Sequence, residues 1–210
     1  MIRLTRPIIM WKFILLLFFV FMPIERALSA QSLEPDSAEN SPFVSLEMCM
    51  VEISFFVHVQ PRMASNQFAV WIEDMDENYV ASVFATRYTA QGGYEQRPLS
   101  LPEWREVSGW DSKQAQYVDG ISGATPVSGN HQVYWDCRDS KDNLVDPGRY
   151  IYKMEGNIFW ENRVVWTGEV EIGQHVYKSE ATPEYLPERA HRKGILLEDV
   201  RAFYKPGDSP

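Results

Sequence analysis

Apolar and polar residues alternate along several short segments of the chain, and this is the pattern of β-strands with one buried face. Between residues 43 and 59, apolar side chains recur at every second position, namely Val51, Ile53, Phe55, Val57 and Val59. Pro61 ends this segment, because proline has no backbone N–H to donate within a sheet. The pattern predicts a strand that packs one face into a core.

Two further pairs of strand-like segments are each joined by a short polar turn, which predicts two hairpins. The segments are rich in β-branched and aromatic residues, which strands favour. We expect both hairpins to add antiparallel strands to one core. The strands and turns are residues 68–73, 74–78 and 79–86 in the first hairpin, and 151–160, 161–163 and 164–172 in the second.

Residues 91–116 lack this alternation, and we interpret them as a crossover with about one helical turn. Trp104 and Trp110 lie in this segment. Aromatic side chains bury large apolar areas, so both are expected to cap the core. The alternative is an exposed platform on which a sugar ring could stack.

Composition and pattern divide the chain into four parts. Residues 1–30 form a signal segment, and residues 31–42, rich in Ser, Glu, Pro and Asn, form a disordered lead-in. Short strands separated by turn signals occupy residues 43–178, which predicts an all-β, immunoglobulin-like antiparallel β-sandwich. Residues 179–210 are expected to form a loop, an edge strand at 195–204 and a C-terminal tail.

The signal segment has the three parts of a secretory signal: basic residues before position 13, an apolar run at 13–22 and small residues at 27–30. The apolar run is shorter than the roughly 20 residues that span a bilayer. Cleavage after Ser29 or Ala30 would release a periplasmic or secreted protein without a membrane-inserted part. An uncleaved N-terminal anchor is the alternative.

Acidic residues outnumber basic ones, and the chain carries a net charge of −9. Residues 1–30 hold four basic residues and one acidic residue, so the remaining chain carries −12. Such a surface repels phosphate groups and holds no basic patch, which argues against nucleic acid or anionic lipid as partners. We expect a protein partner in the cell envelope.

The two cysteines, Cys49 and Cys137, are a candidate disulfide because an exported protein meets an oxidising compartment. Sequence does not determine whether their Cα atoms lie close enough to be bridged. The alternative is a buried thiol at Cys49 and an exposed thiol at Cys137. Two cysteines without matching histidines do not form a zinc site.

The stretch from 133 to 152 contains Trp135-Asp136-x-x-Asp139 followed by Val145-x-Pro147-Gly148-x-Tyr150. It resembles the immunoglobulin-like repeat of the flagellar hook-capping protein and of other secreted sandwich domains. The resemblance implies that Trp135 packs into the sandwich and that Asp136 and Asp139 accept hydrogen bonds from turn amides. It also implies that Tyr150 returns to the core with its hydroxyl at the rim.

A wider set of residues, between 49 and 172, is similar to a family of periplasmic proteins grouped as a domain of unknown function. The matching pieces are Trp71-Ile72-Glu73-Asp74, Leu101-Pro102-x-Trp104, Ser122-Gly123-Ala124-Thr125-Pro126 and Trp135-Asp136. The resemblance implies the fold and an envelope location but no activity. Some members of that family are associated with flavin-linked extracellular electron transfer.

Residues 119–125, here called the acceptor segment, read Asp119-Gly120-Ile121-Ser122-Gly123-Ala124-Thr125. They look like the motif at which a separate flavin transferase attaches FMN. The resemblance implies that the Thr125 hydroxyl attacks the FAD pyrophosphate and retains FMN as a phosphoester. Gly123 and Ala124 would let the backbone enter the transferase cleft. Asp119 would orient the segment or help to hold the metal that polarises the phosphate.

The chain departs from this motif after Thr125, because Pro126-Val127 intervenes before the next hydroxyl, that of Ser128. The alternative is that the acceptor segment is a tight structural loop that is not chemically modified. Gly123 would then take a positive φ, and the Ser122 and Thr125 hydroxyls would bond loop amides.

No other grouping of residues indicates a reaction. The four histidines are scattered along the chain, and Ser122 lacks the following helix of a nucleophile elbow. Asp74, Asp76 and Asn78 have the spacing that opens a calcium loop, but its central Gly and closing Glu are missing. We therefore expect a non-enzymatic, exported binding or accessory module without a cofactor. The alternative is a covalent FMN carrier modified at Thr125.

Overall fold

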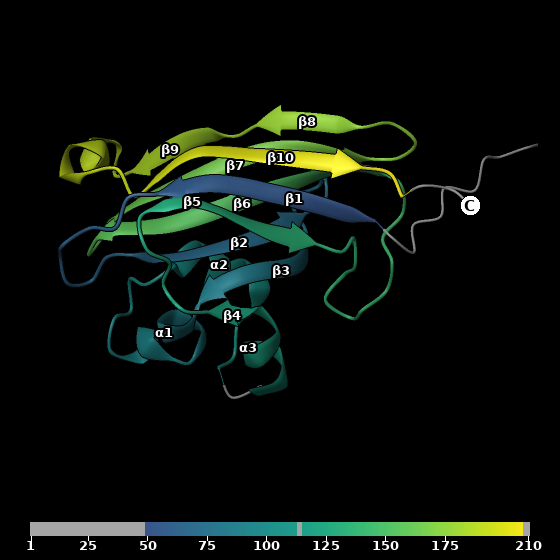
Figure 1. The fold of residues 1–210 in the computed structure, drawn as a ribbon. Helices are drawn as coiled ribbons and strands as arrows, with labels where there is room; N and C mark the ends of the chain where they lie inside the picture. Colours follow the sequence, from purple (N-terminus) through teal and green to yellow (C-terminus); the bar gives the residue numbers. More distant parts are fainter. Residues whose placement is uncertain (1–48, 113–114, 208–210) are drawn as a thin grey trace, which may run out of the picture. The chain divides into compact units, whose positions relative to one another are not determined.

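Two β-sheets pack face to face in the computed structural model, which describes residues 49–112 and 115–207 (Figure 1). The predicted signal segment and lead-in, residues 1–30 and 31–42, lie outside the described residues. All pairings between strands are antiparallel except a two-residue parallel pairing of β3 with β4. The prediction of an all-β sandwich is confirmed.

Sheet A contains four of the described strands. In spatial order they are β5 (Gly129–Trp135), β1 (Met50–Val57), β10 (Leu197–Lys205) and β8 (Tyr177–Glu180). Sheet B contains the other six. In spatial order they are β4 (Ser122–Gly123), β3 (Tyr79–Thr86), β2 (Gln67–Glu73), β6 (Gly148–Phe159), β7 (Asn162–Ile172) and β9 (Thr182–Leu186).

The alternating pattern of the first predicted strand is confirmed in β1, where Val51, Ile53, Phe55 and Val57 are buried. Val59 departs from it, because the chain leaves the sheet after Val57 and the Val59 side chain is 41% exposed. Both predicted hairpins are confirmed as β2–β3 and β6–β7. These strands supply the larger of the two apolar cores, which lies between the sheets.

The prediction of about one helical turn in the crossover is wrong, because short helices cover the outer face of sheet B (Figure 1). Every residue of β2 is buried, so this strand needs cover on both faces. Trp71 and Trp104 meet in a second apolar core beneath the helices, which excludes Trp104 from an exposed platform. The helices are α1 (Arg87–Ala90), η2 (Gly93–Glu95), α2 (Pro102–Ser108) and α3 (Ala115–Ile121).

The sandwich extends past residue 178, so the loop predicted at the start of residues 179–210 and the edge position predicted for 195–204 are wrong. Residues 181–193 contain β9 and the 3-10 helix η3 (Glu188–Lys193). Pro183 is compatible with β9 because this strand lies at the edge of sheet B. β10 pairs with β1 on one side and β8 on the other, and so lies inside sheet A.

The strand register defines two ends of the sandwich. The turn end carries the β2–β3 turn at 74–78 and the loop at 136–147. The acceptor end carries residues 58–66, 124–128 and the β6–β7 turn at 160–161. The two regions singled out in the sequence, the acceptor segment and the turn that follows Trp135, therefore lie at opposite ends.

Candidate functional site

The middle of the acceptor segment is a strand rather than a loop. α3 ends at Ile121, and Ser122 and Gly123 then form β4, which pairs with Ala85 and Thr86 of β3. The expected positive φ at Gly123 is wrong, because Gly123 is not among the positive-φ glycines. A Cβ atom at Gly123 would lie 2.5 Å from the Phe84 ring, so glycine is required by close packing.

Thr125 and Ala124 are exposed immediately after this strand, and Asp119 is exposed on α3. Within the part of the chain that the structure describes, the hydroxyls of Ser122 and Thr125 form no hydrogen bond with a loop amide. The structure therefore presents the Thr125 hydroxyl at the surface.

The chain is held again just beyond Thr125, where it crosses from sheet B to sheet A. Ser128 Oγ accepts a hydrogen bond of 2.9 Å from the backbone N–H of Val59. His131 Nε2 lies 2.7 Å from the carbonyl oxygen of Val127. The exposed residues thus lie between two anchored points, β4 and Ser128.

Two turns of the same design lie at the turn end. Asp74 Oδ1 accepts a 2.9 Å hydrogen bond from the backbone N–H of Asn78, and Asp139 Oδ1 accepts one of 2.9 Å from Asn143. Hydrogen bonds from Asn78 and Asn143 lower the pKa of the two carboxyl groups. Both carboxylates are already occupied in forming turns. Among the described residues no cluster of His, Cys, Asp and Glu could hold a metal ion.

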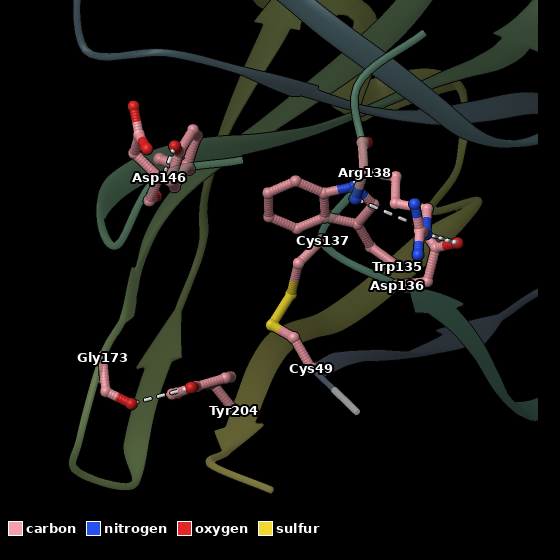
Figure 2. Close-up of a disulfide and its surroundings, with 9 residues drawn as sticks. Cys49, Trp135, Asp136, Cys137, Arg138, Asp146, Gly173 and Tyr204 are labelled. Atoms are coloured by element: carbon pink, nitrogen blue, oxygen red, sulfur yellow. Dashed lines mark hydrogen bonds and ion pairs between the residues drawn. A yellow bond between two sulfur atoms is a disulfide. The ribbon is translucent and has the colours of Figure 1, made fainter. Parts of the chain in front are cut away.

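Cys49 and Cys137 form the candidate disulfide at the same end, with a Cα–Cα distance of 5.8 Å (Figure 2). The buried Trp135 packs in the same core, and its Nε1–H donates a 2.8 Å hydrogen bond to the carbonyl of Arg138 (Figure 2). The predicted role of Asp136 is confirmed, since its Oδ1 accepts a bond of 3.2 Å from the Arg138 N–H.

Tyr150 returns to the core as predicted. Its ring centroid lies 5.4 Å from that of Trp135 in an edge-on arrangement. Its hydroxyl donates a 2.7 Å hydrogen bond to the carbonyl of Asp146 at the rim. The Trp135 and Tyr150 rings therefore pack beside the disulfide at the turn end of the core.

A buried charged network between sheet B and α2 was missed in the sequence. Glu155 of β6 is fully buried, and its Oε2 accepts a 3.0 Å hydrogen bond from the Trp104 backbone N–H. Arg163 Nε lies 3.2 Å from Oε1 of the same carboxylate. Burial raises the pKa of Glu155 to about 7. The available signal was a Glu in the middle of β6, on the same face of the strand as Lys153.

The network continues along the sheet through a second buried carboxylate. Glu73 Oε2 lies 3.0 Å from Lys153 Nζ, and Glu73 Oε1 accepts a 2.7 Å hydrogen bond from Trp71 Nε1–H. Glu103 of α2 lies 3.7 Å from Lys153 and 3.9 Å from Arg163. These contacts attach the helical cover to the sheet, because each buried charge has an opposite charge beside it.

The fold and these sites define an all-β domain with an internal disulfide and a helical cover on one sheet. The family described as "Predicted periplasmic protein (DUF2271)" matches residues 50–185, and the chain belongs to it. This agrees with the expected periplasmic location. Among the described residues, no helix has the length and apolar character needed to cross a membrane.

No significant match was found among curated proteins or among solved structures. The likeness to the immunoglobulin-like repeat of the flagellar hook-capping protein stays a prediction. The family description assigns no activity.

Proposed function

We propose that the protein is a non-enzymatic accessory module of the periplasm that presents residues 124–128 to a protein partner. The observation that supports this is the exposure of Thr125 between β4 and the Ser128–Val59 hydrogen bond. A segment held at both ends loses little conformational entropy when it binds. The disulfide-linked sandwich supplies the rigid frame.

Site-specific photo-crosslinking in the native periplasm tests this proposal. A benzophenone amino acid is placed at Thr125 and, as a matched control, at Val176, which is exposed at the opposite end of the sandwich. We expect one adduct of defined mass from position 125 and none from position 176. Identical adducts from both sites, or catalytic turnover by the purified protein, would contradict the proposal.

The second candidate function is a covalent FMN carrier in extracytoplasmic electron transfer. It is favoured by the sequence of the acceptor segment together with the exposure of Thr125 and its freedom from intramolecular hydrogen bonds among the described residues. The flavin would carry the electrons, and the protein would hold it at the edge of sheet B.

The attachment reaction conserves redox state. Thr125 Oγ1 forms a bond to the FMN-side phosphorus of FAD, and the pyrophosphate P–O bond breaks. AMP leaves, and the threonine hydroxyl releases its proton. The exposure of Ala124 and Thr125 is the feature that a separate flavin transferase would need.

Intact-mass measurement after coexpression with a flavin transferase decides this candidate. We expect the mass to rise by one FMN phosphoester and the visible absorbance of flavin to accompany the protein. Thr125→Ala should abolish both signals, whereas Ser140→Ala, which removes an exposed hydroxyl at the turn end, should retain them. An unmodified wild-type mass would reject flavin attachment and leave the crosslinking result unaffected.

A further inference from the structure

A shallow, open hollow of about 70 Å³ lies at the acceptor end, between the β6–β7 turn and the segment that precedes α2. Its apolar walls are Ala64, Pro98, Leu99 and Trp160. Leu99 and Trp160 are 50% and 49% exposed, although large apolar side chains are usually covered in a folded domain. Two of the eleven large apolar side chains that are exposed among the described residues therefore line one hollow.

A single buried side chain holds the walls of this hollow. Asn157 Oδ1 accepts a 3.0 Å hydrogen bond from the Leu101 N–H. Its Nδ2 donates to the carbonyls of Leu99 at 3.0 Å and Trp160 at 3.4 Å. The Trp160 N–H donates to the Ala64 carbonyl at 3.1 Å. The shape of the hollow is thus set by hydrogen bonds before any ligand arrives.

Three residues around the hollow have left-handed backbone conformations. The φ values are 56° at Ala64, 48° at Leu101 and 48° at Trp160. Such conformations cost on the order of 1 kcal/mol each for residues other than glycine, and they gather at ligand sites. The fold therefore keeps Trp160 at the surface at an energetic cost.

Positive charge without a carboxylate partner lies beside the apolar walls. Arg97 lines the hollow, and its guanidinium carbon lies 4.6 Å from the centroid of the Tyr88 ring. Arg62 lies over the ring of Phe159, the residue next to Trp160. Within the described ranges, neither arginine forms an ion pair with an acidic side chain. These cations would attract an acidic partner.

We propose that this hollow is the docking site for an aromatic side chain carried on an acidic segment of a protein partner. The aromatic ring would pack between Leu99 and Trp160, because aromatic anchors in preformed pockets supply most of the binding energy of many interfaces. Carboxylates beside it would pair with Arg97 and Arg62. This inference uses none of the residues of the acceptor segment and is independent of the functions proposed for it.

The test uses three synthetic peptides and the ¹⁵N-labelled protein. The probe is an acetylated pentapeptide with one tryptophan between two pairs of glutamates. In the control peptides, the tryptophan is replaced by alanine or the glutamates by lysines. We expect the acidic tryptophan peptide to shift the Trp160 indole and Leu99 amide resonances saturably, and the two controls to bind at least about tenfold more weakly.

Variants of the protein connect the binding to this hollow. Trp160→Ala, Leu99→Ala and Arg97→Glu should each weaken the acidic peptide at least about tenfold. Tyr134→Ala changes a similarly exposed aromatic (47%) on β5, and Arg189→Glu reverses an exposed charge on η3. Both control variants should bind like the wild type. The ¹⁵N spectrum shows whether each variant is folded.

Three results would overturn the proposal. The first is equal binding of the lysine peptide, and the second is the lack of a saturable shift at millimolar peptide. The third is a concentration-dependent dimer in sedimentation that dissociates in Trp160→Ala, because a second copy of the chain would then occupy the hollow. Leu99→Ala and Arg97→Glu keep the test decisive if Trp160→Ala fails to fold.

Discussion

Nε of Arg163 lies 3.2 Å from Oε1 of Glu155, whose side chain is fully buried between sheet B and α2. The two groups are close, but the Nε–H direction does not give a hydrogen bond, so the contact is an ion pair only. Burial opposes the charged form of Glu155 more strongly than Arg163 and the Trp104 N–H support it. The pKa of Glu155 is therefore raised to about 7.

The raised pKa of Glu155 predicts that the domain loses stability as the pH rises. Its pKa is about 7 in the folded protein and about 4.5 in the unfolded chain. The folded state thus holds this proton more tightly, and the contribution is complete below pH 4.5 and lost as the pH rises through 7. The expected loss is on the order of 3 kcal/mol.

Chemical unfolding of the wild type and Glu155→Gln between pH 4.5 and 8 measures this effect. The wild type should lose free energy of unfolding relative to Glu155→Gln as the pH rises. Glu169→Gln, which changes an exposed carboxylate on β7, should follow the wild-type profile. Parallel profiles for wild type and Glu155→Gln would show that Glu155 keeps an ordinary pKa.

Removing the disulfide should destabilise the domain strongly. Cys49 and Cys137 are 88 residues apart, and closing a loop of this length restricts the unfolded chain. We expect the double variant Cys49→Ser/Cys137→Ser to lose about 3–5 kcal/mol in the free energy of unfolding. A reducing agent should lower the melting temperature of the wild type and leave that of the double variant unchanged. A wild type that is insensitive to reduction would contradict this.

Trp135→Ala is expected to be the most damaging single change in the core. Trp135 is buried against the disulfide and the Tyr150 ring, so truncation leaves a cavity and should cost about 3–5 kcal/mol. Trp160→Ala is the matched control, because Trp160 is half exposed. Melting curves of both variants provide the measurement. Equal melting temperatures for Trp135→Ala and the wild type would place Trp135 outside the core.

Two glycines of the acceptor segment should respond differently to alanine. At Gly123 the new Cβ would lie 2.5 Å from the Phe84 ring, and the overpacking should cost about 1–3 kcal/mol. At Gly120, in α3, no neighbouring atom lies within 4 Å, so the helix-favouring alanine should stabilise by up to about 1 kcal/mol. Thermal unfolding of Gly123→Ala and Gly120→Ala compares them. Destabilisation of both to the same extent would exclude the packing explanation.

The local elements of the fold could be predicted because their causes lie within a few residues. Alternating apolar residues define β1, and the polar turns define the β2–β3 and β6–β7 hairpins. The short side chains of Asp136 and Asp139 bond amides two to four residues away, so their roles follow from spacing alone. The exposure of Thr125 could not be read in the same way, since it depends on β4 pairing with β3.

The strand-forming segments and the turns that join them follow from the order of the residues alone, because periodicity and turn chemistry act over short distances. The acidic character of the chain follows from its composition. Three features arise only in the folded domain, namely the pairing of Cys49 with Cys137, the place of β10 inside sheet A and the burial of Glu155 under α2. Each of these depends on which distant segments become neighbours. The pairing of distant segments is set by the burial of apolar area across the whole domain, so it cannot be read from any single stretch of residues.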